Sequence, residues 1–112
     1  MTKKELLEHC EGYLETSFDV RETLTLLKRY GYKFLSWGSH DFYNMKDKGL
    51  LFKVQGHHHK GWVLITLNWT DTYSIKLLKN NGEVTYSLDM VYNDELFNIL
   101  DEKIEKIPEY VD

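Results

Sequence analysis

The chain has 112 residues, 42% of them hydrophobic, and carries a formal net charge of −4. This length predicts a single domain over residues 1–112 that is large enough to bury a core, and the composition excludes a disordered chain. The single cysteine, Cys10, excludes an internal disulfide. No run approaches the roughly 18 apolar residues of a membrane helix, and no apolar leader follows Met1. We therefore expect a cytoplasmic protein with no membrane partner.

The charge is divided unevenly along the chain. Residues 1–20 carry a net −3, residues 21–82 a net +6 and residues 83–112 a net −7. Such a division lets the middle and the C-terminal segment attract different partners. The alternative is that the acidic ends solubilise the domain and pair with its middle.

Two amphipathic helices are predicted in the N-terminal part. Thr2 and Glu5 have the spacing of a capping box, and the apolar residues that follow recur at helical spacing, which predicts a helix near residues 3–15. Asp19 is a suitable N-cap for a second helix. Gly31 can take the left-handed conformation that ends this second helix.

The hydrophobic period after the second helix is typical of strands. Residues 32–37 alternate weakly and predict a short strand, and a loop is expected at 38–41. Residues 50–55 and 62–67 predict two further strands joined by a turn at 56–61. The second of these two is apolar on both faces, as expected for a central strand.

Asn81-Gly82 predicts a two-residue hairpin turn, because both residues tolerate positive φ. With the turn at this place, three cross-strand pairs are predicted, namely Lys79–Val84, Leu77–Tyr86 and Ile75–Leu88. A slip of one residue would turn the apolar side chains of the two strands to opposite faces, so the pattern specifies the register.

A last helix is predicted after residue 93, with Asn93 as its N-cap. Tyr92 and Phe97 lie at the positions of a hydrophobic staple. The predicted buried stripe consists of Leu96, Leu100, Ile104 and Ile107, and Pro108 marks the end.

Together these segments predict an α+β fold with the element order α-α-(β)-β-β-β-β-α. Hairpin connections imply an antiparallel meander of four strands, or of five if residues 32–37 form one. The N-terminal and C-terminal helices pack against this sheet. We expect them to cover one of its faces and to leave the other open.

Five short motifs follow one another over roughly residues 34–100. They are Phe34-x-x-Trp37-Gly38 with Phe42, Leu50-x-Phe52-Lys53, Ile65-Thr66-Leu67-Asn68, Asp71-x-Tyr73-x-Ile75 and Val91-Tyr92-x-Asp94-x-Leu96. In this order they resemble a family of small proteins encoded in bacteriophages, prophages and plasmids. The resemblance implies an α+β fold and a mobile-element setting, but no reaction and no functional residues. Compared with the family, the loop around Gly38 is one residue shorter and the first helix is an addition.

The tract His57-His58-His59 suggests a metal site. In an extended chain His57 and His59 point to the same side, so their imidazoles could converge. A zinc site needs at least a third ligand, for which His40 is a candidate. The alternative is a solvated turn between two glycines, without a metal.

No nucleophile elbow, phosphate-binding loop or zinc-protease motif occurs in the chain, so we expect a non-enzymatic protein that needs no cofactor and acts by binding. The first hypothesis is binding of a protein partner, or self-association as a homodimer. It predicts an apolar patch on the open sheet face formed by Trp62, Leu64 and Leu78.

The second hypothesis is a nucleic-acid-binding module that uses the basic, aromatic-rich segment 33–79. Its lysines could contact phosphates while its aromatic rings stack on bases. The predicted surface consists of Trp37, Trp62, Lys53, Lys60 and Lys76. A third hypothesis is an acidic inhibitor of a host nucleic-acid enzyme, in which the C-terminal segment imitates a nucleic-acid backbone. Lysines on one open face with Trp62 or Trp37 would favour nucleic acid, and an apolar open face would favour association.

Overall fold

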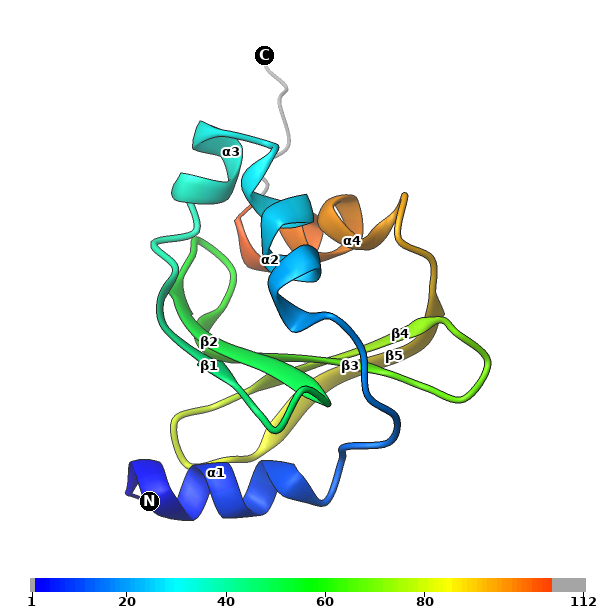
Figure 1. The fold of residues 1–112 in the computed structure, drawn as a ribbon. Coiled ribbons are helices and arrows are strands. Elements are labelled where there is room, and N and C mark those ends of the chain that lie inside the picture. The colour runs from blue at the N-terminus through cyan, green and yellow to red at the C-terminus, as the bar shows by residue number, and fades with distance from the viewer. Residues whose placement is uncertain (1, 106–112) are drawn as a thin grey trace.

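The computed structural model describes residues 2–105, which form an α+β fold (Figure 1). The helices are α1 (Lys3–Glu11), α2 (Val20–Lys28), α3 (Tyr32–Leu35) and α4 (Leu96–Ile104). The strands are β1 (His40–Asn44), β2 (Gly49–Gln55), β3 (Lys60–Leu67), β4 (Tyr73–Leu78) and β5 (Val84–Val91). They form one antiparallel sheet of order β1-β2-β3-β4-β5, in which each strand pairs with its neighbours in sequence. The predicted meander is confirmed, with five strands.

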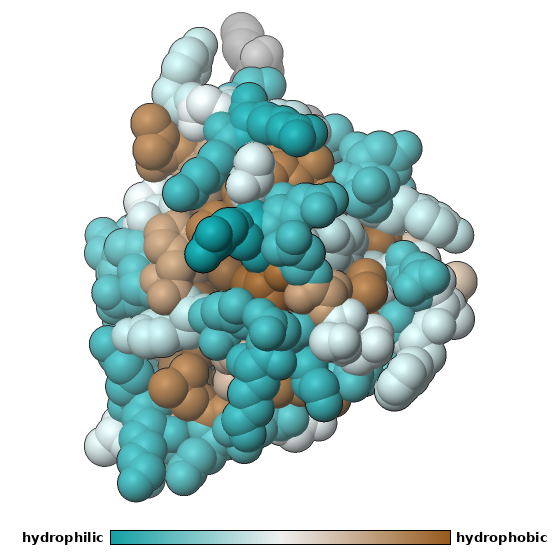
Figure 2. All heavy atoms as spheres, viewed as in Figure 1, coloured by the Kyte–Doolittle hydropathy of each residue, from teal (hydrophilic) through white to brown (hydrophobic). Residues whose placement is uncertain are grey.

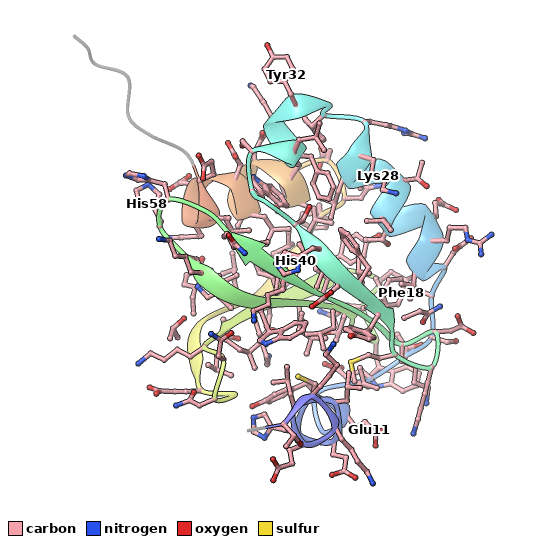
Figure 3. The ribbon with its side chains drawn as sticks, turned by 90° about the vertical axis from the view of Figure 1, so that its left-hand side faces the viewer. Glu11, Phe18, Lys28, Tyr32, His40 and His58 are labelled. Atoms are coloured by element: carbon pink, nitrogen blue, oxygen red, sulfur yellow. The ribbon has the colours of Figure 1, made fainter. Side chains whose placement is uncertain are left out.

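Helices cover both faces of this sheet. On one face, α2, α3 and α4 enclose the larger of two hydrophobic clusters, and on the other face α1 packs over the smaller cluster. Figure 3, in which α1 is seen end-on, shows the sheet between these two layers. The expectation that one face stays open is therefore wrong. An amphipathic stripe predicts that a helix packs against something, but it does not say which face it covers.

Residues 32–37, predicted as a strand, instead contain helix α3. Gly31 has a φ of 62°, and local bonds follow it, such as the 2.9 Å bond from the Ser36 amide to the Tyr32 carbonyl. Phe34 and Trp37 are three residues apart, so one helical turn buries both, whereas a strand would point them to opposite faces. The fifth strand is β1, which begins within the segment expected to be a loop.

Trp37 joins α3 to α4 inside the larger cluster. Its indole Nε1 donates a hydrogen bond of 2.8 Å to the carboxylate of Asp101. Its ring is stacked on that of Phe97, with 4.8 Å between centroids, and Phe97 is stacked on Tyr30 at 3.8 Å. Phe97 therefore packs against the end of α2 and not in the predicted staple with Tyr92, which is exposed.

The predicted N-caps are right for the first two helices of the chain and wrong for the last one. The capping box of Thr2 and Glu5 is confirmed, and so is the Asp19 cap. The prediction of Asn93 as the last N-cap is wrong, since α4 begins at Leu96. Two further predictions for this helix, Ile107 and Pro108, lie outside the described residues.

Two predicted cross-strand pairs of the last hairpin are confirmed, Leu77–Tyr86 and Ile75–Leu88. The third is wrong, because Val84 pairs with Leu78 and not with Lys79. Gly82 has a φ of 89°, and its amide donates to the Lys79 carbonyl at 2.9 Å. The loop therefore has three residues, with a bulge at the glycine. The predicted two-residue turn is wrong, although its place in the sequence is right.

Gly56 is expected to be essential for the packing of α4 on the sheet. A Cβ at this position would overlap both the side chain and the carbonyl of Ile104. We predict that Gly56→Ala lowers the free energy of unfolding by about 1–3 kcal/mol, the usual cost of overpacking. Urea unfolding would measure it.

Gly12 is the matched control for this measurement. Its φ is −66°, and an added Cβ would meet only the His9 carbonyl, at an ordinary 3.6 Å. Gly12→Ala should leave the protein unchanged or make it more stable by about 0.4–1 kcal/mol. Equal stability of the two alanine variants would contradict the proposed overlap at Gly56.

Candidate functional site

The predicted apolar patch on the sheet is buried. Trp62, Leu64 and Leu78 lie in the smaller cluster beneath α1, where Leu6 and Cys10 pack on them. Trp62 is only 5% exposed. The expectation of an exposed association patch at these residues is therefore wrong. Trp37, predicted for the nucleic-acid surface, is buried in the other cluster.

The predicted basic residues lie on the sheet face that α1 crosses. Strand register places Lys53 beside Trp62 and Lys76 beside Leu64 on that face, with Lys60 at the start of β3. The ammonium of Lys53 is 5.5 Å from the centre of the Trp62 ring, and that of Lys76 is 5.0 Å from the ring of Tyr13. The lysines thus surround α1, while Trp62 is too deeply buried to stack on a base.

The three candidate metal ligands are not brought together. Among residues 2–105, no three His, Cys, Asp or Glu side chains are grouped so that they could hold a metal ion. His40 lies on β1 beside Asp41, away from the β2–β3 turn that carries His58 (Figure 3). In that turn, the backbone amide of His57 donates to Glu105 at 2.7 Å, and the His59 ring donates to the Trp62 carbonyl at 3.1 Å.

The exposed apolar side chains lie elsewhere. Eight large apolar side chains are exposed among the described residues, and they fall into two groups. Tyr30, Tyr32, Leu35 and Phe42 lie in or next to α3 and in β1, and Trp69, Leu88, Met90 and Tyr92 lie in the β3–β4 turn, in β5 and directly after it. We call this second group the Trp69 surface. In Figure 2, hydrophobic residues on the visible face form small separate areas surrounded by hydrophilic ones.

Trp69 is held in solvent by a densely bonded turn between β3 and β4. The side-chain oxygen of Asn68 accepts hydrogen bonds from the amides and the hydroxyls of Thr70 and Thr72, at 2.6–3.3 Å. The backbone amide of Asn68 donates a hydrogen bond of 2.9 Å to the backbone carbonyl of Thr72. Trp69 is nevertheless 77% exposed at the tip of this turn. The turn is therefore organised without any contribution from burial of the indole.

The other members of the Trp69 surface come from β5 and the segment after it. Val91 pairs with Tyr73, so the end of β5 lies beside the start of β4, next to the turn (Figure 1). The register shifts between Tyr73 and Ile75, and Met90 has a φ of 60°. This bulge leaves Met90 61% exposed. The sequence analysis missed this surface, because exposed and buried apolar residues look alike in a strand pattern.

Cys10 should be inert toward thiol reagents in the folded protein. Its side chain is buried between α1 and the sheet, and this burial raises the pKa of the thiol to about 11. We predict very slow reaction with Ellman's reagent at pH 8 and rapid reaction in denaturant, because the thiolate is the reactive species. Rapid reaction under native conditions would mean that α1 leaves the sheet readily.

His59 should make the protein less stable in mild acid. Burial lowers the pKa of its imidazole from 6.5, and the hydrogen bond to Trp62 offsets this only in part. As pH falls below about 6.5, the His59 imidazole of the unfolded chain takes up a proton before that of the folded protein does. The contribution of His59 to stability is therefore present above this pH and is lost below it. When the pH is lowered from 7.5 to 5.5, the free energy of unfolding should fall less in His59→Gln than in the wild type, as measured by urea unfolding at each pH. An unchanged pH dependence in His59→Gln would contradict the assignment.

The described helices include none that is both long and apolar enough to cross a membrane. Comparison of the chain with protein-family models, with curated proteins and with solved structures found no match. The resemblance to phage, prophage and plasmid proteins therefore stays a prediction from the sequence.

Proposed function

We propose that this chain is a non-enzymatic accessory protein that binds another polypeptide through the Trp69 surface. The observation that carries the proposal is a tryptophan 77% exposed on a turn that is already organised by hydrogen bonds. Tryptophan and tyrosine dominate the binding energy of protein interfaces. Because the turn is held by Asn68, little backbone conformational entropy remains to be lost when a partner buries Trp69.

The charge around this surface indicates the chemistry of the partner. The charged residues in the β3–β4 turn, β5 and the segment before α4 are acidic, namely Asp71, Asp89, Asp94 and Glu95. These four carboxylates neighbour the apolar residues in sequence, and we take them as the acidic rim of the surface. Such a surface complements a hydrophobic pocket bordered by lysine or arginine. A host enzyme with a basic surface, as in the third sequence hypothesis, has this character.

The same charges favour a different protein over a second copy of this chain. In a symmetric dimer, the same patch of both subunits meets, so the acidic rims would face each other. Like charges brought together in this way oppose association. We therefore place self-association second for this surface.

Nucleic acid is also less well supported at this surface. Its acidic rim would repel phosphates, and the lysines around α1 have no exposed tryptophan beside them. The family resemblance implies that the chain is encoded in a mobile element. We therefore propose that its partner is a protein of the host cell.

The test is capture of partners from host lysate, treated with nuclease, by the wild type and two variants. Trp69→Ser removes the anchor, and Tyr32→Ser removes an aromatic side chain that is 82% exposed at the α3 end. We expect one partner to be lost with Trp69→Ser and retained with Tyr32→Ser. With the purified partner, Trp69→Ser should weaken binding by about 2 kcal/mol, roughly thirtyfold in Kd.

Asn68→Ala tests whether the turn itself matters. It keeps Trp69 but removes the acceptor of four hydrogen bonds, so binding should weaken while the indole remains present. Equal binding by Trp69→Ser and Tyr32→Ser would overturn the proposal. Loss of all captured material on nuclease treatment would instead support the nucleic-acid alternative.

A further inference from the structure

A small cavity of about 190 Å³ lies between the start of α1 and the sheet. Its lining residues are Thr2, Lys3, Leu6, Lys53, Trp62 and Asn80. Asn80 belongs to the β4–β5 turn, and the Trp69 surface begins at the β3–β4 turn, so the two sites lie at opposite ends of β4. The cavity is therefore separate from the surface proposed to bind a protein.

Positive charge at this cavity is not neutralised by ion pairs. Lys3 and Lys53 both line it, no carboxylate does, and neither lysine forms an ion pair within residues 2–105. The carboxylate of Glu5 accepts a hydrogen bond of 2.7 Å from the Thr2 backbone amide. The cavity thus has two cationic groups that an anion could bridge.

Both ammonium groups are positioned by aromatic rings. Lys53 lies 5.5 Å from the ring centre of Trp62, and Lys3 lies 5.3 Å from that of Tyr43. Tyr43 and Trp62 are themselves 6.2 Å apart, so the two lysines are supported by one aromatic pair. Such contacts limit the motion of lysine side chains that would otherwise be fully solvated.

The remaining walls define the rest of a ligand. Trp62 and Leu6 supply apolar surface, and the side-chain amide of Asn80 supplies a donor. Two lysines suit a doubly charged group better than a single carboxylate, and lysine is a common phosphate ligand.

We propose that this cavity binds the phosphate group of a small phosphorylated molecule. The phosphate lies between the ammonium groups of Lys3 and Lys53, with the Asn80 amide as a further donor. Trp62 and Leu6, which are 5% and 2% exposed, close the floor of the cavity, so the organic part of the ligand extends outward from the phosphate. The proposed interaction is reversible binding without any covalent chemistry.

The experiment is a titration of the ¹⁵N-labelled protein with phenyl phosphate at low salt, with phenol as the probe that lacks phosphate. We expect saturable shifts at the amides of Lys53 and Asn80 and at the Trp62 indole with phenyl phosphate only. Lys53→Gln should weaken binding about tenfold or more, the effect of losing one charge-assisted hydrogen bond. Lys48→Gln, in an exposed turn, should bind as the wild type does.

Lys3→Gln provides a second variant, on an exposed side chain, should Lys53→Gln disturb the fold. The absence of saturable shifts, or equal binding by the Lys48 and Lys53 variants, would overturn the proposal. Tighter binding at the same residues by oligothymidine without a terminal phosphate would overturn the assignment to a small molecule. Trp69→Ser should bind phenyl phosphate normally, so this test can fail independently of the proposed protein binding.

Discussion

The structure depends on one constraint, which is that β3 is apolar on both of its faces. Val63 and Ile65 point into one cluster, and Trp62 and Leu64 into the other. Each face must therefore be removed from water, and a sheet of one layer cannot do this alone. The helices divide accordingly: α2, α3 and α4 enclose the larger cluster, and α1 alone covers the smaller one. This division also decides which surfaces remain available for binding.

Much of the fold could be predicted from the sequence, because short-range patterns specify it. Neighbouring residues determine the alternation of β2 and β4, the place of the turn at Asn81-Gly82 (though not its length) and the caps at Thr2 and Asp19. The errors arose where tertiary packing decides. The face covered by α1, the helical turn that buries Phe34 with Trp37, and the start of α4 all depend on partners that are distant in sequence.

The binding surfaces were less predictable for the same reason. Trp62 and Trp69 both lie in apolar, aromatic-rich segments, yet one is buried and the other stands in solvent. A local signal did exist for the second, since Asn68 followed by Thr70 and Thr72 has the side chains for a self-bonded turn. The lysine positions were predicted, but their aromatic contacts were not, because these join β2 to β3 and β4 to the segment after α1.

The pairing of every strand with its neighbour in sequence has a consequence for how the chain folds during synthesis. Contacts in such a meander are local, a topology associated with rapid folding. The sheet can assemble hairpin by hairpin behind the helices that have already emerged from the ribosome. The larger cluster, however, remains partly uncovered until α4, the last element of the described chain, has been translated. A chain stalled after β5 would thus present an apolar sheet face, and it would be a target for chaperones or for aggregation.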